Sequence, residues 1–178
     1  RLTGPILKRV YNPGDPRLAE GATPFMRAAK GADLTVMRLL IGAGADPKLD
    51  QKNGNTPLML TASAGSGRGS DNNPDHVTEA QALAALDYLI GLGLDLNATN
   101  DEGDSVMHVA STTNLGSPAV IRFLYGKGAR LDVKNKAGRT PLEAVLRARE
   151  TSEDTVSLLK QLSAATTAGA RDAAPTTN

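Results

Sequence analysis

The dipeptide Thr-Pro occurs three times in this chain, each time at the start of a short apolar segment. The pairs are Thr23-Pro24, Thr56-Pro57 and Thr140-Pro141. Thr23 and Thr56 are 33 residues apart, and the 84 residues between Thr56 and Thr140 leave room for two longer units, with Ser105-Val106-Met107-His108 as a degenerate copy between them. A period in the low thirties is typical of an array of stacked units that bury their apolar faces against one another.

Each Thr-Pro pair has the properties of a helix start. Threonine is a good N-cap because its side chain accepts a hydrogen bond from a free backbone N–H, and proline is favoured at the first helical position. We therefore expect helices to begin at Thr23, Thr56 and Thr140. A second apolar segment follows in each unit and is expected to supply the main core: Leu39-Leu40, Leu89-Ile90, Phe123-Leu124 and Leu158-Leu159. Glycines that suit a left-handed helix end follow three of these segments: Gly44, Gly93 and Gly128.

These copies resemble ankyrin repeats, whose pattern is Gly-x-Thr-Pro-Leu-His-x-Ala-Ala, a second helix ending in Leu-Leu, and then Gly-Ala-Asp. Gly54-Asn55-Thr56-Pro57-Leu58 matches the first part of the pattern, and Gly44-Ala45-Asp46 matches the last. The resemblance extends over about residues 18–162 and implies an all-α fold, an ankyrin-repeat solenoid of helix-turn-helix units with projecting β-hairpin loops. The implied repeats are about 21–50, 54–98, 103–133 and 138–162. The set also resembles ankyrin proteins that are abundant in bacteria.

Two segments interrupt the repeat pattern. Residues 1–17 contain three prolines but also apolar side chains, and they predict an enlarged hairpin loop that either binds a partner or covers the first unit. Residues 66–80 are an insertion within the second repeat, polar and rich in Gly, Ser and Asn, which predicts a mobile loop. This loop is either a tolerated surface insertion, which costs little, or a contact arm. Thr78 and Gln81 predict a capping box at its end.

The C-terminal part of the chain is more polar than the other copies. Ser152, Glu153, Asp154 and Lys160 would lie on the last second helix, as expected of a terminal unit with a polar outer face. Residues 163–178 are mainly Ala, Thr and Gly, and this composition predicts a disordered tail or a linker.

The composition argues against several classes of function. The formal net charge is +1, so the strong positive electrostatic field of a nucleic-acid-binding protein is not expected. Only 3% of the residues are aromatic, so side chains on which bases could stack are not expected either. The chain has no cysteine, which excludes disulfides and thiol nucleophiles. No apolar run approaches the roughly 18 residues that a membrane-spanning helix needs.

The two histidines offer no evident chemistry. His108 occupies the histidine place of Thr-Pro-Leu-His, and the resemblance implies that it bonds between neighbouring hairpin turns. His76 lies near Asp71 and Asp75, but the spacing up to Glu79 does not reproduce a calcium-binding loop. No nucleophile, base and acid form a recognisable set. We therefore expect no catalytic, cofactor-binding or metal-binding residue; an enzyme built on an ankyrin-like scaffold is the third and least favoured interpretation.

The resemblance implies that the hairpin tips and the first helices form a concave surface that binds another protein. Within this surface, one acidic tip stands beside a basic one, which is the feature that suggests a partner with complementary charges. The expected partner-binding residues are Arg27, Lys30, Lys52, Asn53, Asn55, Asp101, Glu102, Asp104, Lys134, Lys136 and Arg139. Further exposed positions on the first helices would be Ser63, Ala64, Thr112 and Thr113. Polar tips that are merely solvated are the alternative.

The favoured function is a non-enzymatic protein-protein interaction module. The alternative is a structural or targeting portion of a larger, exported bacterial ankyrin protein, with the first and last residues as cut edges. Self-association through an exposed terminal repeat is a further expectation. The sequence gives no targeting segment and hence no localisation.

Overall fold

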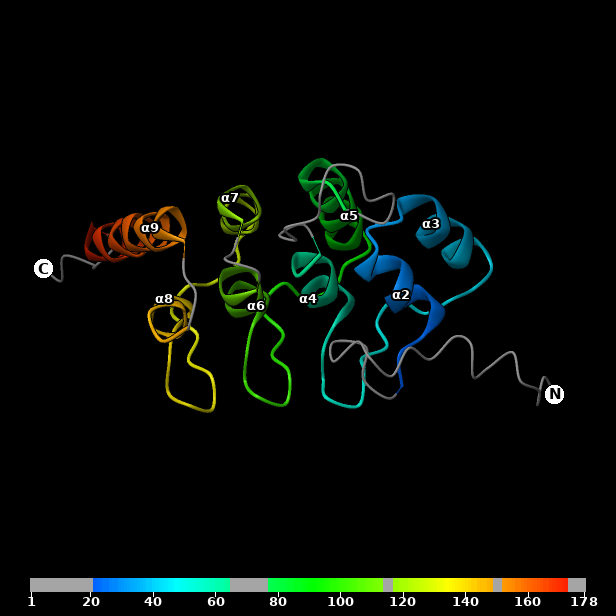
Figure 1. The fold of residues 1–178 in the computed structure, drawn as a ribbon, viewed down its shortest axis with the longest axis horizontal. Helices are drawn as coiled ribbons and strands as arrows, with labels where there is room; N and C mark the ends of the chain where they lie inside the picture. The colour runs from blue at the N-terminus through cyan, green and yellow to red at the C-terminus, as the bar shows by residue number, and fades with distance from the viewer. Residues whose placement is uncertain (1–20, 65–76, 114–116, 149–151, 173–178) are drawn as a thin grey trace, which may run out of the picture.

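The computed structural model describes residues 21–64, 77–113, 117–148 and 152–172, and these residues form pairs of helices stacked side by side (Figure 1). The first helices of the pairs are α2 (Pro24–Lys30), α4 (Pro57–Ala62), α6 (Val106–Thr112) and α8 (Pro141–Val145). The second helices are α3 (Leu34–Gly42), α5 (Glu79–Gly91), α7 (Pro118–Gly126) and α9 (Glu153–Asp172). The expected all-α solenoid is confirmed.

The helices begin where the sequence predicts. The hydroxyl oxygens of Thr23, Thr56 and Thr140 each accept a hydrogen bond from the backbone N–H three residues later, at 3.2–3.3 Å. Proline occupies the first turn of each of these helices. The predicted capping box at the start of α5 is also present, because Gln81 N–H donates to Thr78 and Thr78 N–H donates back to the Gln81 side chain.

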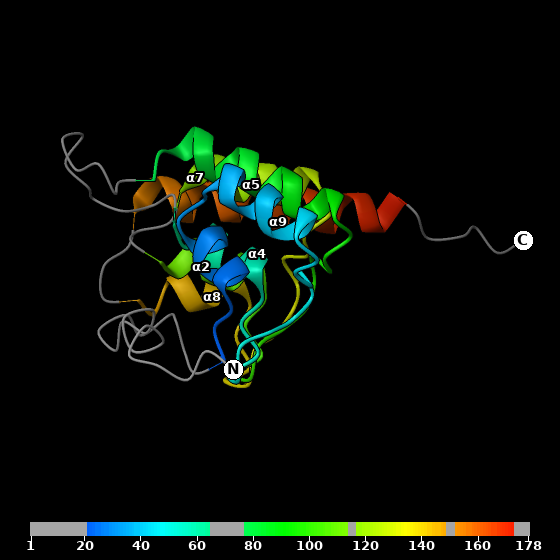
Figure 2. The same ribbon diagram turned by 90° about the vertical axis from the view of Figure 1, so that its right-hand side faces the viewer.

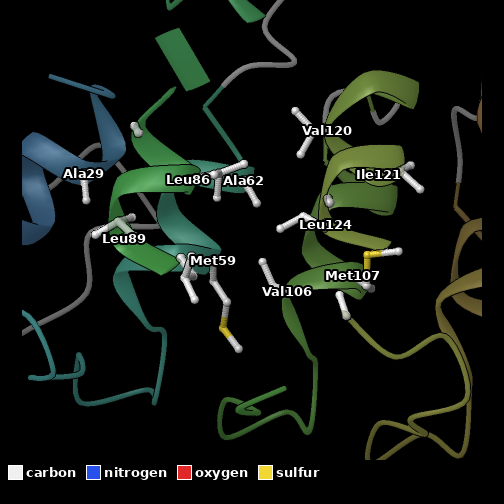
Figure 3. Packing of buried hydrophobic residues seen from close by; sticks show 14 of the residues in the cluster. Ala29, Met59, Ala62, Leu86, Leu89, Val106, Met107, Val120, Ile121 and Leu124 are labelled. Atoms are coloured by element: carbon white, nitrogen blue, oxygen red, sulfur yellow. The ribbon is translucent and has the colours of Figure 1, made fainter. Parts of the chain in front are cut away.

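The core runs along the stack between the two rows of helices. Leu86 and Leu89 of α5 and Leu124 of α7 are fully buried, together with Met59 of α4 and Met107 of α6 (Figure 3). First helices contribute small residues such as Ala29 and Ala62, which allow close approach to the second helices. Every unit therefore shares its buried surface with its neighbours, as α4 does with α2, α5 and α6.

The first unit departs from the predicted core. Leu39 of α3 is 68% exposed and Leu40 is only half-buried, so the prediction that both belong to the main core is wrong for Leu39. Val36 is 39% exposed, whereas Ala85, Val120 and Thr155, at the same place in the later units, are at most 1% exposed. Each later second helix packs against the second helix before it, whereas no second helix precedes α3 within the described residues.

The C-terminal helix is longer than the sequence suggested. α9 continues to Asp172, into the segment for which the composition predicted a disordered tail or a linker. Alanine is the best helix former, which favours continuation through Ala164 and Ala165. The hydroxyl of Thr166 also lies 3.0 Å from the Tyr125 hydroxyl of α7. The expectations for residues 1–17, most of the 66–80 insertion and 173–178 concern parts of the chain outside the described residues.

Three hairpins project from one side of the stack, below the first helices (Figure 1). Viewed along the stack, they superpose at one edge (Figure 2). No helix in the described ranges has the length and apolar character needed to cross a membrane.

Candidate functional site

The three hairpin tips share one turn geometry. We call residues 50–55 the first tip, 99–104 the second tip and 134–139 the third tip. In each, a glycine N–H donates to the carbonyl three residues earlier at 2.8 Å; the pairs are Gly54 to Gln51, Gly103 to Asn100 and Gly138 to Asn135. All three glycines have positive φ. The tips therefore present equivalent positions at regular intervals along the stack.

Backbone hydrogen bonds join each tip to the next. The amide of Asp101 in the second tip donates to the carbonyl of Asn53 in the first, at 3.0 Å. The amide of Lys136 in the third tip donates to the carbonyl of Glu102 in the second, at 2.9 Å. The spacing and the order of the tips are thus fixed by main-chain contacts rather than by side chains alone.

Asparagine side chains form a second set of links between the tips. Asn100 Nδ2 donates to Asn55 Oδ1 at 2.8 Å, and Asn135 Nδ2 donates to Asp104 Oδ1 at 2.7 Å. The Oδ1 atoms of Asn100 and Asn135 each accept two backbone amides of their own tip. These asparagines hold the turn and its neighbour together. This role is not evident from the residue types alone; the signal in the sequence is their identical place, three residues before the turn glycine.

Within the described residues, the first tip lacks this side-chain link to the preceding unit. Gln51 stands where the other tips have asparagine, and its side chain is 3% exposed with neither amide atom hydrogen-bonded. The position that corresponds to Asn55 and Asp104 is Ala22, which has no side-chain acceptor. Asn53 replaces Gln51 in supporting the turn, since its Oδ1 accepts the amide of Asn55 at 3.2 Å.

His108 has the structural role that the resemblance implied. Its ring is 1% exposed, and Nδ1 accepts the backbone N–H of Ser105 at 3.1 Å. Nε2 therefore carries the proton, and it lies 2.9 Å from the carbonyl of Arg139 in the third tip. The buried imidazole joins the start of α6 to the next hairpin, which leaves it no free nitrogen for catalysis.

The second tip is acidic and the third tip is basic, whereas the first tip carries one charge of each sign. Asp50 and Lys52 are exposed on the first tip, Asp101 and Glu102 on the second, and Lys134, Lys136 and Arg139 on the third. Asn53, Asn55 and Asp104 are half-buried. The ion pairs seen within the described residues, Lys127–Asp87 and Arg130–Asp132, do not involve the second or third tip.

The first helices contribute fewer exposed side chains than expected. Arg27 and Lys30 of α2 are half-buried, and burial lowers the pKa of Lys30. The Arg27 Nε atom is buried without a hydrogen-bond partner. Thr112 is exposed and Ala64 is half-buried, but Ser63 and Thr113 are buried, so the expectation of exposure is wrong for these two. Ser63 and Thr113 are the C-cap residues of α4 and α6.

A cavity of about 210 Å³ lies between α4 and α6 beside the second tip. Its lining residues are Asn55, Met59, Leu60, Ser63, Asn100, Asp104, Val109, Thr112 and Thr113. Another cavity, of about 240 Å³, is lined by Pro47, Asp50 and Asp95, and burial raises the pKa of Asp50. The part of the chain that the structure describes contains no group of three metal-ligating side chains.

The chain is similar to known repeat proteins over most of the described residues. Residues 20–52 match the family model of the ankyrin repeat. The chain is 26% identical over 79% of its length to human "SH3 and multiple ankyrin repeat domains protein 2", and 31% identical over 67% of its length to human "B-cell lymphoma 3 protein". It is 29% identical over 61% of its length to the fruit-fly "NF-kappa-B inhibitor cactus". The matches span 9% to 24% of these relatives. All three are animal proteins, so they do not support the likeness to bacterial proteins.

Proposed function

Because the chain is an ankyrin repeat protein, we propose that it is an interaction module that binds another protein through its hairpin tips and the adjoining concave face. The supporting observation is an acidic second tip beside a basic third tip, held in register by hydrogen bonds. Opposite charges on the second and third tips lie one repeat apart and do not pair with each other. They are available to a partner that carries a complementary order of charges.

The titles of two relatives fit this proposal. One is an inhibitor of NF-kappa-B by name, which is a statement about a protein partner of that relative. Another has multiple ankyrin repeats beside a domain of a different kind. Neither title identifies the partner of this chain, and affinity capture followed by mass spectrometry is the experiment that would do so.

Reversing charge on the third tip is expected to slow association with a captured partner. The double variant Lys134→Glu, Lys136→Glu should reduce the association rate constant about ten-fold at low salt, since steering depends on the sign of the local field. The difference should shrink at high salt, where the charges are screened. Surface plasmon resonance at two salt concentrations measures both effects.

A matched control carries the same change in net charge on the second helices. Arg122 of α7 and Lys160 of α9 are exposed and lie outside the tips. The variant Arg122→Glu, Lys160→Glu should leave the association rate close to that of the unaltered chain. Equal rates for the tip variant and this control would show that the tips do not guide the partner.

We also propose weak self-association through α3. The supporting observation is the exposure of Val36 and Leu39 at positions that the later units bury. The outer face of α9 has exposed Ser157 and Lys160, so two copies would meet α3 against α3. Sedimentation velocity should show a sedimentation coefficient that rises with concentration and a Leu39→Lys variant that stays monomeric. No concentration dependence in the unaltered chain would refute the proposal.

A further inference from the structure

We propose that the cavity between α4 and α6 binds a basic side chain, lysine or arginine, of the protein partner. The inference rests on the proposed interaction function and adds the chemistry of one anchor residue. It depends on three features of the cavity: an apolar floor, a polar rim and a single carboxylate whose negative charge the scaffold does not require.

The floor of the cavity suits an aliphatic stem. Met59 and Leu60 are each 2% exposed, and Val109 of α6 is half-buried opposite them. Long basic side chains commonly lay their methylene groups on apolar surface while the charged end stays near water. A volume of about 210 Å³ gives such a stem room to enter.

The rim provides hydrogen-bonding groups near where a cationic head would lie. Among the described residues that line the cavity, Asp104 of the second tip is the only charged one, and it is half-buried. Its Oδ1 accepts the Asn135 amide at 2.7 Å, and no other described side chain bonds its carboxylate. Asp101 and Glu102 on the same tip add charge of the same sign. The basic residues of the third tip do not line the cavity.

The scaffold does not need this negative charge. Asn55, Asp104 and Arg139 occupy the same place in successive tips, directly before the residue that starts the next helix. Asn55 accepts the Asn100 amide with its Oδ1 just as Asp104 accepts the Asn135 amide. A neutral amide therefore makes the same link between tips. The negative charge of Asp104 is not needed for that link and can interact with a ligand.

Other side chains fit the cavity less well. An acidic side chain would be repelled by Asp104 and by the acidic tip around it. A purely aliphatic side chain would cover the floor but would also take water away from the carboxylate without replacing its hydrogen bonds. The methylene groups of a lysine or arginine would cover the apolar floor, and its positive charge would lie beside the Asp104 carboxylate. Arginine can in addition donate two parallel hydrogen bonds to that carboxylate.

The test is an NMR titration of the full chain labelled with ¹⁵N. The probes are N-acetyl-arginine amide and N-acetyl-lysine amide, with N-acetyl-citrulline amide as the uncharged analogue of arginine. The basic probes should cause saturable shifts of the Asn55 and Asn100 side-chain amides and of the Thr112 backbone amide. The Asp104→Asn variant should bind them at least about three-fold more weakly, as expected for loss of a partly exposed ion pair.

Asp104→Asn reproduces the residue that the first tip already has at this place, so its fold and the Asn135 link should survive. Asp95→Asn is the matched control, because the Asp95 carboxylate also accepts one hydrogen bond, from the backbone amide of Asn97, but does not line this cavity. The control should bind the probes as the unaltered chain does.

Three results would overturn the subsite: shifts of equal size with citrulline, equal affinity in Asp104→Asn, or no saturable shift with either basic probe. The titration does not use the partner, so its failure leaves the tip-reversal experiment standing. Conversely, a partner insensitive to tip charge would refute the proposed function while a positive titration would still establish the cavity as a cation site.

Discussion

Replacing Leu89 by alanine is expected to lower the free energy of unfolding by about 2–5 kcal/mol. Leu89 is fully buried in α5, which packs against α3, α4 and α7. Truncation removes apolar contacts and leaves a cavity that helices held on three sides cannot close. Urea unfolding followed by circular dichroism measures the change as a lower midpoint.

Leu39→Ala provides the control for this variant. The residue type and the substitution are the same, but the Leu39 side chain is 68% exposed on α3. Its effect should stay within about 0.5 kcal/mol, as for most surface substitutions. If the two variants unfolded at the same urea concentration, the assignment of Leu89 to the shared core would be wrong.

Replacing Gly103 by alanine is expected to cost about 2–4 kcal/mol, from left-handed backbone strain together with a steric clash. Gly103 has a φ of +75°, and a Cβ at this position would lie 2.8 Å from the backbone N of Lys136 in the third tip. Relief of that contact requires the third tip to move, which weakens the hydrogen bond from Lys136 N–H to Glu102. Thermal and urea unfolding report the loss of stability, and amide exchange at Lys136 reports the opening of the link.

The variant Gly138→Ala is the control that separates backbone strain from the steric clash. The φ of Gly138, +73°, is nearly the same, but a Cβ there meets nothing within 4 Å. Gly138→Ala should therefore cost only the backbone strain, about 1–2 kcal/mol. Gly54, where a Cβ would lie 3.0 Å from the second tip, should fall between the two. Equal losses at Gly103 and Gly138 would mean that the close approach of the tips contributes nothing.

Features that depend on a few neighbouring residues were predictable from the sequence. The helix starts at Thr23, Thr56 and Thr140 follow from cap chemistry within one turn, and the capping box at Thr78 follows in the same way. The role of His108 followed from its place in the repeat pattern. The repeats strengthened these predictions, because aligning the copies showed which residues occupy equivalent positions.

Features that depend on the neighbouring unit were not predictable in the same way. Leu39 fits the core position of the repeat pattern, but no second helix precedes α3 within the described residues. Ser63 and Thr113 are buried although their side chains are polar. The composition of residues 163–172 indicated disorder, whereas alanine propensity and the Thr166 contact with α7 favour a helix. The acidic second tip beside the basic third tip was visible in the sequence, but the asparagine links and the cavity required the fold.

The links between tips also restrict how this surface can be altered. The asparagine side-chain amide of the next tip needs an acceptor oxygen on the residue that precedes the helix start. Asn55 and Asp104 supply that oxygen. Exchange between asparagine and aspartate preserves that oxygen. The first and second tips can therefore change charge at this position without changing the backbone of the turn. Arg139 receives no such amide from the described residues and can take either sign. Variants with altered specificity are therefore easiest to obtain at the third tip, where binding can be redesigned without disturbing the stack.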